Sequence, residues 1–237
     1  MRTVRWLKDC LKSRLGVPTI ELSLAELRKN GFSPGVVFDV GAHRGDFARL
    51  CRKLFVQKPV VYCFEPLQKC APFLTDLERK GEATYLPALL GDTDAESVPF
   101  YEMGSASSVF DEHAPAGDKV VTKKSVSRLD TLIESGKCRV PDFLKIDAQG
   151  SELHVLKGIE RNLPHVQVIL AELNFLDIYA GVPLAHQVIQ WLGDRNFLPY
   201  DIASLIRRPL DRVLWQADFL FVQADGPFRS DKRWNRR

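Results

Sequence analysis

The chain has 237 residues, 45% hydrophobic and 27% charged, which is typical of a globular protein with one sizeable domain. The formal net charge is only +3, and residues 229–237 hold five basic residues and one aspartate, so the rest is nearly neutral; this excludes a nucleic-acid-binding surface by net charge. Five cysteines without a C-x-x-C pair argue against a disulfide frame or zinc site. The sequence has no apolar stretch of ~18 residues and no signal-peptide pattern. These absences and the cysteine pattern predict a cytoplasmic protein without a transmembrane segment.

Two helices are expected before the main domain. Apolar residues recur at helical spacing along residues 4–15, with basic residues elsewhere. Such a helix packs on its own domain or on a second subunit, as in a homodimer; a weak membrane-surface contact is the alternative. A second helix is expected from Ser23 to Asn30, with Ser23 as N-cap and Gly31 just past its end. Residues 1–34 are therefore interpreted as an N-terminal helical extension.

Strands and helices alternate from residue 35 onward. The expected strands are 36–40, 60–64, 83–88, 143–147, 166–172, 197–200 and 218–222, with short antiparallel additions at 98–101 and 124–127. The expected helices are 45–55, 68–80, 129–135, 151–158 and 185–195. This order predicts an α/β, Rossmann-like domain over 35–224, a mostly parallel sheet with helices on both faces. Residues 225–237 are expected to be a basic, disordered tail.

A glycine-containing loop follows the first expected strand and opens a helix. Its spacing is G-x-x-x-G, and not the G-x-G-x-x-G of dinucleotide binders. A dinucleotide places its pyrophosphate at the helix N-terminus, whereas S-adenosylmethionine has no phosphate and its ammonium and sulfonium need acidic partners. Asp39 at the strand end can supply one. The loop residues expected to bind the cofactor are Gly41, Ala42, His43, Arg44 and Gly45.

The second and third strands end in further candidates for cofactor binding. Glu65, followed by Pro66, can accept hydrogen bonds from both hydroxyls of a ribose. Ala88 and Leu89 are expected to lie beside an adenine, and Ser108 is expected to close over the cofactor. Glu65 comes 26 positions after Asp39, a spacing that also fits an NAD(P)-dependent oxidoreductase. That alternative stays open at this point.

Catalytic candidates lie at the ends of later strands. Strand alternation places Lys145 and Asp147 on one face, and the next strand ends in Glu172. Carboxylates gathered at strand ends without partners are costly, which indicates a site. Transfer of a methyl group to a hydroxyl benefits from a base, for which Asp147 is the first candidate and Glu172 and His154 the next. Lys145 would pair with a carboxylate or an anionic substrate. No carboxylate cluster demands a metal ion.

Several stretches together resemble the FkbM family of methyltransferases. They are Phe38–Gly45, Phe64–Pro66, Ser127–Leu132, Leu144–Gly158, Glu172, Ile178–Gly181 and Trp215–Val222. The resemblance implies a class I methyltransferase fold with a seven-stranded sheet whose last strand is antiparallel, and S-adenosyl-L-methionine as cofactor. It also implies O-methylation of sugar hydroxyls in polysaccharides or glycosylated metabolites, or of a non-sugar natural-product hydroxyl. The family usually has Glu where this chain has Gln149.

Aromatic residues are compatible with a sugar acceptor. Ring faces for a carbohydrate could come from Tyr101, Phe110, Phe175, Tyr179 and Trp215. The expected partner is therefore a glycan or glycosylated small molecule, and no nucleic acid is expected.

Overall fold

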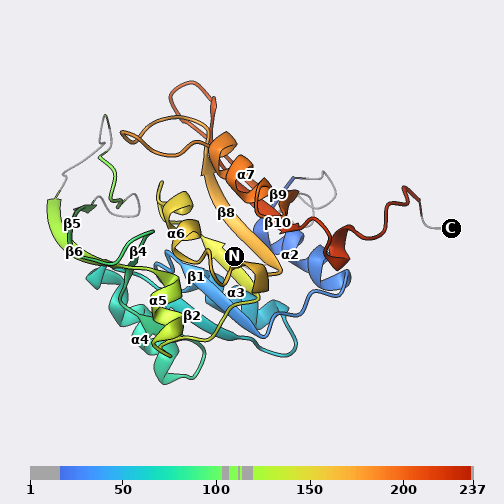
Figure 1. Cartoon of the computed structure of the whole chain (residues 1–237), viewed down its shortest axis with the longest axis horizontal. Coiled ribbons are helices and arrows are strands. Elements are labelled where there is room, and N and C mark those ends of the chain that lie inside the picture. Colours follow the sequence, from blue (N-terminus) through green and yellow to red (C-terminus); the bar gives the residue numbers. More distant parts are fainter. Residues whose placement is uncertain (1–16, 103–106, 112, 114–119, 236–237) are drawn as a thin grey trace, which may run out of the picture.

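The computed structural model describes residues 17–102, 107–111, 113 and 120–235. Its centre is a seven-stranded sheet in the order β3-β2-β1-β7-β8-β10-β9 (Figure 1). The strands are β1 (Val36–Val40), β2 (Val60–Phe64), β3 (Thr84–Leu86), β7 (Phe143–Ile146), β8 (Val168–Asn174), β9 (Phe197–Arg207) and β10 (Leu214–Gln223). The pairs among β3, β2, β1, β7 and β8 are parallel, and β10 runs antiparallel to both its neighbours. The predicted sheet with an antiparallel last strand is confirmed.

Helices cover both faces of this sheet, as predicted. They are α2 (Ile20–Lys29), α3 (Asp46–Leu54), α4 (Ala71–Arg79), α5 (Leu129–Glu134), α6 (Glu152–Gly158) and α7 (Ala185–Gly193). Short 3-10 turns are η1 (Gln68–Cys70), η3 (Leu163–His165) and η4 (Pro227–Arg229). Buried residues of α5, α6 and α7 join one core cluster, and those of α2, α3 and α4 join the other. Alternation along β1 divides its side chains between the two, with Phe38 in the first cluster and Val37 in the second.

The first described helix begins earlier than its sequence pattern indicated. Ser23 lies inside α2, and the N-cap is Thr19, whose hydroxyl accepts a hydrogen bond from the Leu22 backbone N–H at 3.3 Å. The expected cap at Ser23 is therefore wrong, because Thr19 offers the same capping oxygen one turn before it. Gly31 does follow the helix end, with a φ of 96°. The helix expected over residues 4–15 lies outside the described residues.

A small second sheet packs beside the main one. It consists of β4 (Leu89–Leu90), β5 (Ala95–Glu102) and β6 (Val120–Ser127) in the order β4-β6-β5. The β5–β6 pair is antiparallel, as expected, although both strands extend beyond the predicted ranges. The small sheet lies at the opposite end of the molecule from η4 (Figure 1).

Packed structure continues past the expected domain boundary at residue 224. In η4, the Phe228 ring meets the Phe32 ring edge-on at 5.7 Å, and Arg229 Nη1 donates to the Pro199 carbonyl at 3.1 Å. The first part of the predicted tail therefore contacts the domain.

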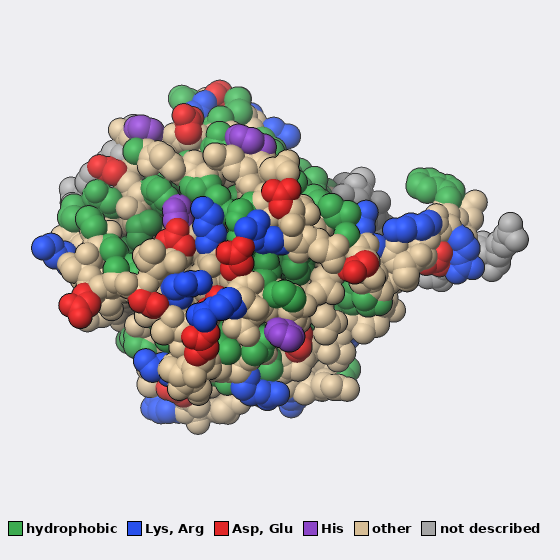
Figure 2. Space-filling view, viewed as in Figure 1, with side chains coloured by type: hydrophobic (Ala, Val, Ile, Leu, Met, Phe, Trp, Pro, Cys, Tyr) green, Lys and Arg blue, Asp and Glu red, His purple; other side chains and the backbone are tan. Residues whose placement is uncertain are grey.

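Basic and acidic side chains are interspersed on the face seen in Figure 2.

Two further predictions concern thiols and membrane spans. The four described cysteines are buried free thiols: Cys51, Cys63, Cys70 and Cys138. None of the helices among the described residues is long and apolar enough to cross a membrane.

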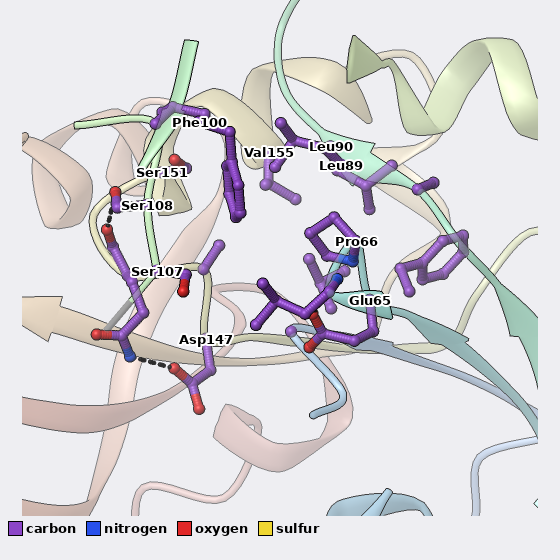
Figure 3. Close-up of a pocket in the computed structure, with 18 of the residues that line it drawn as sticks. Glu65, Pro66, Leu89, Leu90, Phe100, Ser107, Ser108, Asp147, Ser151 and Val155 are labelled. Atoms are coloured by element: carbon purple, nitrogen blue, oxygen red, sulfur yellow. Dashed lines mark hydrogen bonds between the residues drawn. The ribbon is translucent and has the colours of Figure 1, made fainter. Parts of the chain in front are cut away.

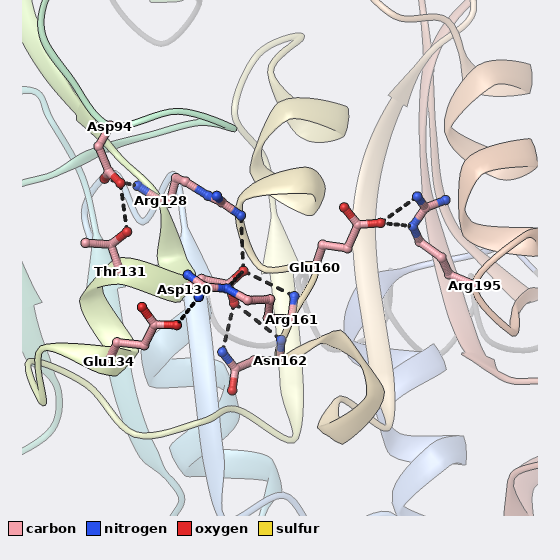
Figure 4. A network of polar contacts seen from close by, with 9 residues as sticks. All are labelled: Asp94, Arg128, Asp130, Thr131, Glu134, Glu160, Arg161, Asn162 and Arg195. Atoms are coloured by element: carbon pink, nitrogen blue, oxygen red, sulfur yellow. Dashed lines mark hydrogen bonds and ion pairs between the residues drawn. The ribbon is translucent and has the colours of Figure 1, made fainter.

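Asp130 joins α5 to the turn after α6, as Figure 4 shows. Its side chain is fully buried and accepts hydrogen bonds from the backbone N–H groups of Arg161 and Asn162 at 3.1 and 3.3 Å. The Asn162 amide adds a third contact at 2.8 Å, and the Arg128 guanidinium lies 3.3 Å away. Asp130 thus belongs to the scaffold, which explains its place in the Ser127–Leu132 stretch without a catalytic role.

Replacing Asp130 by Ala is expected to lower the free energy of unfolding by about 2–4 kcal/mol, because buried donors lose their acceptor. Urea denaturation of the variant measures this loss. Asp76→Ala, which removes an exposed helix ion pair with Lys80, is the control and should leave the midpoint almost unchanged. Equal midpoints for the two variants would contradict the scaffold role.

Candidate active site

A pocket opens at the carboxyl ends of β1, β2 and β7, where parallel sheets place their ligands. It contains about 840 Å³ of atom-free space, part of it open to solvent. Its lining comes from the ends of these strands, from β4 and β5, and from segments 107–109 and 147–151. Figure 3 shows Glu65 and Asp147 along one side of the pocket, with Phe100, Leu90 and Val155 across from them.

The backbone turn at Gly41 forms the floor of the pocket. Gly41 has a φ of 72°, and a Cβ placed there would lie 1.8 Å from the Asp147 carbonyl oxygen. Only glycine allows the two loops to approach so closely. Gly45 has a different reason to be glycine, because its missing Cβ makes room for Leu77 and Leu74 of α4. Of the two glycines in the motif, Gly41 lines the pocket and Gly45 packs the helix layer.

Glu65 is held at one side of the pocket by two backbone donors. Its Oε2 accepts from the His43 N–H at 2.8 Å and its Oε1 from the Leu67 N–H at 2.9 Å. Burial raises the pKa of Glu65, and these two hydrogen bonds oppose the rise. Each oxygen keeps a further lone pair, so this carboxyl group can accept hydrogen bonds from a ligand hydroxyl.

Apolar side chains form the wall opposite Glu65 and Asp147. Leu90 and Phe100 are almost fully buried, and Val155 of α6 is completely so. Together with Pro66 and Ala88 they provide a slot without charge. A flat aromatic group that needs few hydrogen bonds fits such a slot better than a phosphate does.

A buried ion pair lies beneath the pocket. Lys145 Nζ is 3.1 Å from Asp39 Oδ1 and 3.5 Å from Asp147 Oδ2, and it donates to the Val40 and Gly41 carbonyls at 3.2 and 3.1 Å. Burial lowers the pKa of Lys145, but the carboxylates of Asp39 and Asp147 outweigh it and raise that pKa. Lys145 therefore remains a cation. Asp39, fully buried, is not among the residues that line the pocket.

Asp147 lies at the edge of a cluster of carboxyl groups. The side chain of Asp147 is 37% exposed, whereas Glu172 on β8 is buried. Burial raises the pKa of Glu172 to about 9, and the charges of Asp147, Glu152 and Asp218 add to the rise. Glu172 is therefore protonated at neutral pH. No group of three His, Cys, Asp or Glu side chains among the described residues is arranged to hold a metal ion.

Glu152 stabilises the loop that carries Asp147. Its Oε1 accepts from the backbone N–H groups of Ala148 and Gly150 at 3.0 and 3.1 Å. Burial raises the pKa of Glu152 to about 7, although these hydrogen bonds oppose the rise. Its contacts are with the loop backbone, and it does not line the pocket.

The predicted site residues divide into three groups. Those that line the pocket are Gly41, His43, Glu65, Pro66, Ala88, Leu89, Ser108 and Asp147. Lys145 and Glu172 lie next to Asp147, the first through its ion pair and the second through a shared hydrogen-bond donor. Those placed outside the lining are Asp39, Ala42, Arg44, Gly45 and His154.

The residues outside the lining have other contacts. The Arg44 guanidinium lies 4.8 Å from the centre of the exposed Phe73 ring, and Ala42 belongs to the core. The His154 ring is 5.6 Å from the Phe110 ring, and burial lowers the pKa of His154. His154 therefore does not share the pocket with Asp147.

Sequence reasoning missed several residues of the site. Gln149 donates to both Asp147 and Glu172, and Gln216 of β10 donates to Glu172 at 2.8 Å. Phe100 and Leu90 complete the apolar wall from the small sheet. Leu90 and Phe100 lie outside every quoted motif, and Gln149 and Gln216 lie inside FkbM-like stretches whose local pattern does not indicate these contacts, because the contacts join segments that are far apart in the sequence. Gln149 alone had a signal, its departure from the FkbM pattern.

Comparison with known proteins gives two sequence matches. A family model described as the methyltransferase FkbM domain matches residues 39–199. A curated relative, the hexuronic acid methyltransferase AglP of Haloferax volcanii, is 31% identical over 153 residues, which is 62% of this chain and 57% of the relative. The chain thus matches little more than half the length of that relative.

Solved structures also resemble this chain. Precorrin-6y C5,15-methyltransferase from Geobacter metallireducens has 14% identity and a TM-score of 0.45, over 79% of this chain and 78% of the other. Magnesium protoporphyrin IX methyltransferase from Synechocystis has 10% identity and a TM-score of 0.47, over 86% and 77%.

The protonation of Glu172 predicts how stability varies with pH. Between pH 4.5 and about 9 the folded chain holds a proton that an unfolded glutamate releases, so the free energy of unfolding falls as the pH rises through this window. Glu172→Gln mimics the protonated acid and removes this dependence. We expect equal melting temperatures for variant and wild type at pH 5 and a more stable variant at pH 9. The same difference in melting temperature between variant and wild type at pH 5 and at pH 9 would contradict the protonation of Glu172.

Proposed function

The chain belongs to the FkbM methyltransferase family, whose domain spans residues 39–199, and on that premise we propose an S-adenosylmethionine-dependent O-methyltransferase. Its acceptor would be a sugar hydroxyl in a polysaccharide or glycosylated metabolite. One observation carries the proposal. The buried carboxyl group of Glu65, at the end of β2, and the more exposed one of Asp147, after β7, border the same partly apolar pocket.

The hydrogen-bond acceptors and the walls of the pocket fit the adenosyl part of this cofactor. Glu65 offers lone pairs to the two ribose hydroxyls while His43 and Leu67 hold its carboxyl group in place. Leu89, Leu90 and Phe100 offer apolar surface for the adenine. The close approach of Gly41 to the Asp147 backbone places both loops in the lining of the pocket.

The same residues do not favour a dinucleotide. Its pyrophosphate would lie at the N-terminus of α3, as in other nucleotide-binding folds. That helix carries Asp46 in its first turn. Negative charge at this position repels a phosphate. An NAD(P)-dependent oxidoreductase is therefore the weaker reading.

Asp147 is the proposed base. When bound, the cofactor supplies a methyl group made electrophilic by its sulfonium. The Asp147 carboxylate borders the pocket and can accept the proton of an acceptor hydroxyl as the oxygen becomes a nucleophile. Lys145 Nζ lies 3.5 Å from Asp147 Oδ2, so the opposite charges of the two side chains attract each other and hold the carboxyl group at the pocket. Glu172, held protonated, does not compete for the hydroxyl proton.

A sugar acceptor is supported by the relative and by the surface beside β8. The Haloferax volcanii relative is a hexuronic acid methyltransferase by name. Phe175, directly after β8, is 37% exposed, and its N–H donates to the Trp215 carbonyl at 2.8 Å. An exposed ring near the carboxyl end of β8 can pack against a sugar face. A role in polysaccharide biosynthesis, a cytoplasmic location and a homodimer stay predictions.

Glu65→Ala is expected to weaken the binding of S-adenosylhomocysteine about 10–100-fold, because the ribose loses a charged hydrogen-bond acceptor. Isothermal titration calorimetry measures the affinity, and thermal unfolding verifies that the variant is folded. Glu26→Ala, which removes an exposed carboxylate of α2, is the matched control. Unchanged affinity in Glu65→Ala would contradict the assignment of Glu65 to the ribose hydroxyls.

Asp147→Asn is expected to reduce the methyl-transfer rate by roughly 10²–10⁴-fold, the usual contribution of a general base. The affinity for S-adenosylhomocysteine should stay within a fewfold of wild type, since Asn keeps the shape of the side chain. The assay follows label from S-adenosylmethionine into a panel of neutral glycosides, uronic acids and non-sugar alcohols. A near-normal rate would move the base to another residue.

A further inference from the structure

Gln149 makes polar contacts with several segments that are far apart in the sequence. Its Nε2 donates to Asp147 Oδ1 at 2.9 Å and to Glu172 Oε1 at 3.2 Å. Its Oε1 accepts from the Tyr179 hydroxyl at 3.3 Å, and its backbone carbonyl accepts from Ser108 Oγ at 2.6 Å. One side chain and its carbonyl thus connect the loop after β7, strand β8, and the segments around residues 108 and 179.

The amide suits its place between two carboxyl groups. A primary amide carries two N–H donors on one nitrogen, and Gln149 gives one to each carboxyl group. The other oxygen of Asp147 is 3.5 Å from Lys145 Nζ. Both oxygens of Asp147 therefore have a partner, which restricts rotation of the carboxyl group about its last bond.

The backbone at this position favours glycine over glutamine. Gln149 has a φ of 48°, in the left-handed region that side chains with a Cβ adopt rarely. The strain is maintained by contacts around it, including the Ser108 hydrogen bond to its carbonyl. A side chain that stands on such a backbone and joins two carboxyl groups points to a function of that side chain.

We propose that Gln149 is a positioning residue of the active site: its amide fixes the Asp147 carboxylate, beside Glu172, in the orientation that accepts the acceptor's proton. This inference rests on the proposed methyltransferase function. The amide does so without adding charge. The groups around it already include Asp147 and Lys145 from the β7 segment, Glu152 from α6, Glu172 from β8 and Asp218 from β10.

Two variants separate orientation from charge. Gln149→Gly removes the amide while relieving the left-handed backbone, so the fold should be retained. Gln149→Glu keeps the size but replaces two donors by a carboxylate beside Asp147 and Glu172. Gln57→Glu adds the same charge at an exposed turn after α3 and is the matched control. For each protein, kcat and acceptor KM are measured from pH 5 to 10, together with the affinity for S-adenosylhomocysteine.

For Gln149→Gly we expect kcat to fall about 10–100-fold at all pH values, because a misplaced base is inefficient. Acceptor KM and S-adenosylhomocysteine affinity should change less than threefold. For Gln149→Glu we expect kcat to fall at least as far, because two donors are lost and a like charge lies beside Asp147. Gln57→Glu should match wild type. Wild-type kcat and pH profile in both Gln149 variants would overturn the proposal.

A second readout does not depend on turnover. The side-chain carboxyl carbons of Asp147 and Glu172 are titrated by NMR and assigned with Asp147→Asn and Glu172→Gln. The proposal expects the Asp147 titration to move to higher pH in Gln149→Glu and in Gln149→Gly, with the larger shift in Gln149→Glu. Identical titrations in all three proteins would overturn it. Should wild type transfer no methyl group to any acceptor, the proposed function fails, and the titration still decides the role of Gln149.

Discussion

The buried ammonium of Lys145 is the contact on which the geometry of the pocket depends. Because Lys145 on β7 pairs in register with Asp39 on β1, the two side chains meet at 3.1 Å inside the sheet layer. The same ammonium binds the carbonyls of Val40 and Gly41 and lies 3.5 Å from Asp147. A buried cation is tolerated only with such partners. One charge therefore holds the glycine turn, the strand pair and the proposed base together.

The two ends of the pocket follow from where each carboxyl group is held. Glu65 is fixed by backbone donors from the β1 and β2 loops, on the side that faces the small sheet. Asp147 is fixed by Lys145 below and by Gln149 beside it, on the side of β8. Cofactor binding and acceptor activation thus rely on separate supports. A change at one carboxyl group should leave the other in place.

Much of the fold could be predicted from the sequence, because buried parallel strands and their covering helices have strong local patterns. The place of Glu65 and Asp147 at one pocket could be predicted for the same reason, since strand ends meet at one edge of such a sheet. Asp39 shows the limit. Strand alternation turns it toward α3 and Lys145 and away from the pocket, and only the register of β1 with β7 reveals this. The bridge made by Gln149 depends on contacts 23 and 30 residues away, which no local pattern contains.

A crystal structure with S-adenosylhomocysteine tests most directly whether this pocket binds the cofactor. We expect the ribose hydroxyls within hydrogen-bonding distance of Glu65, the adenine against Leu89, Leu90 and Phe100, and the sulfur on the side of Asp147. We also expect Asp39 to keep its contact with Lys145 and not to touch the ligand. A ligand bound elsewhere, or with its ribose away from Glu65, would contradict the assignment of this pocket to the cofactor.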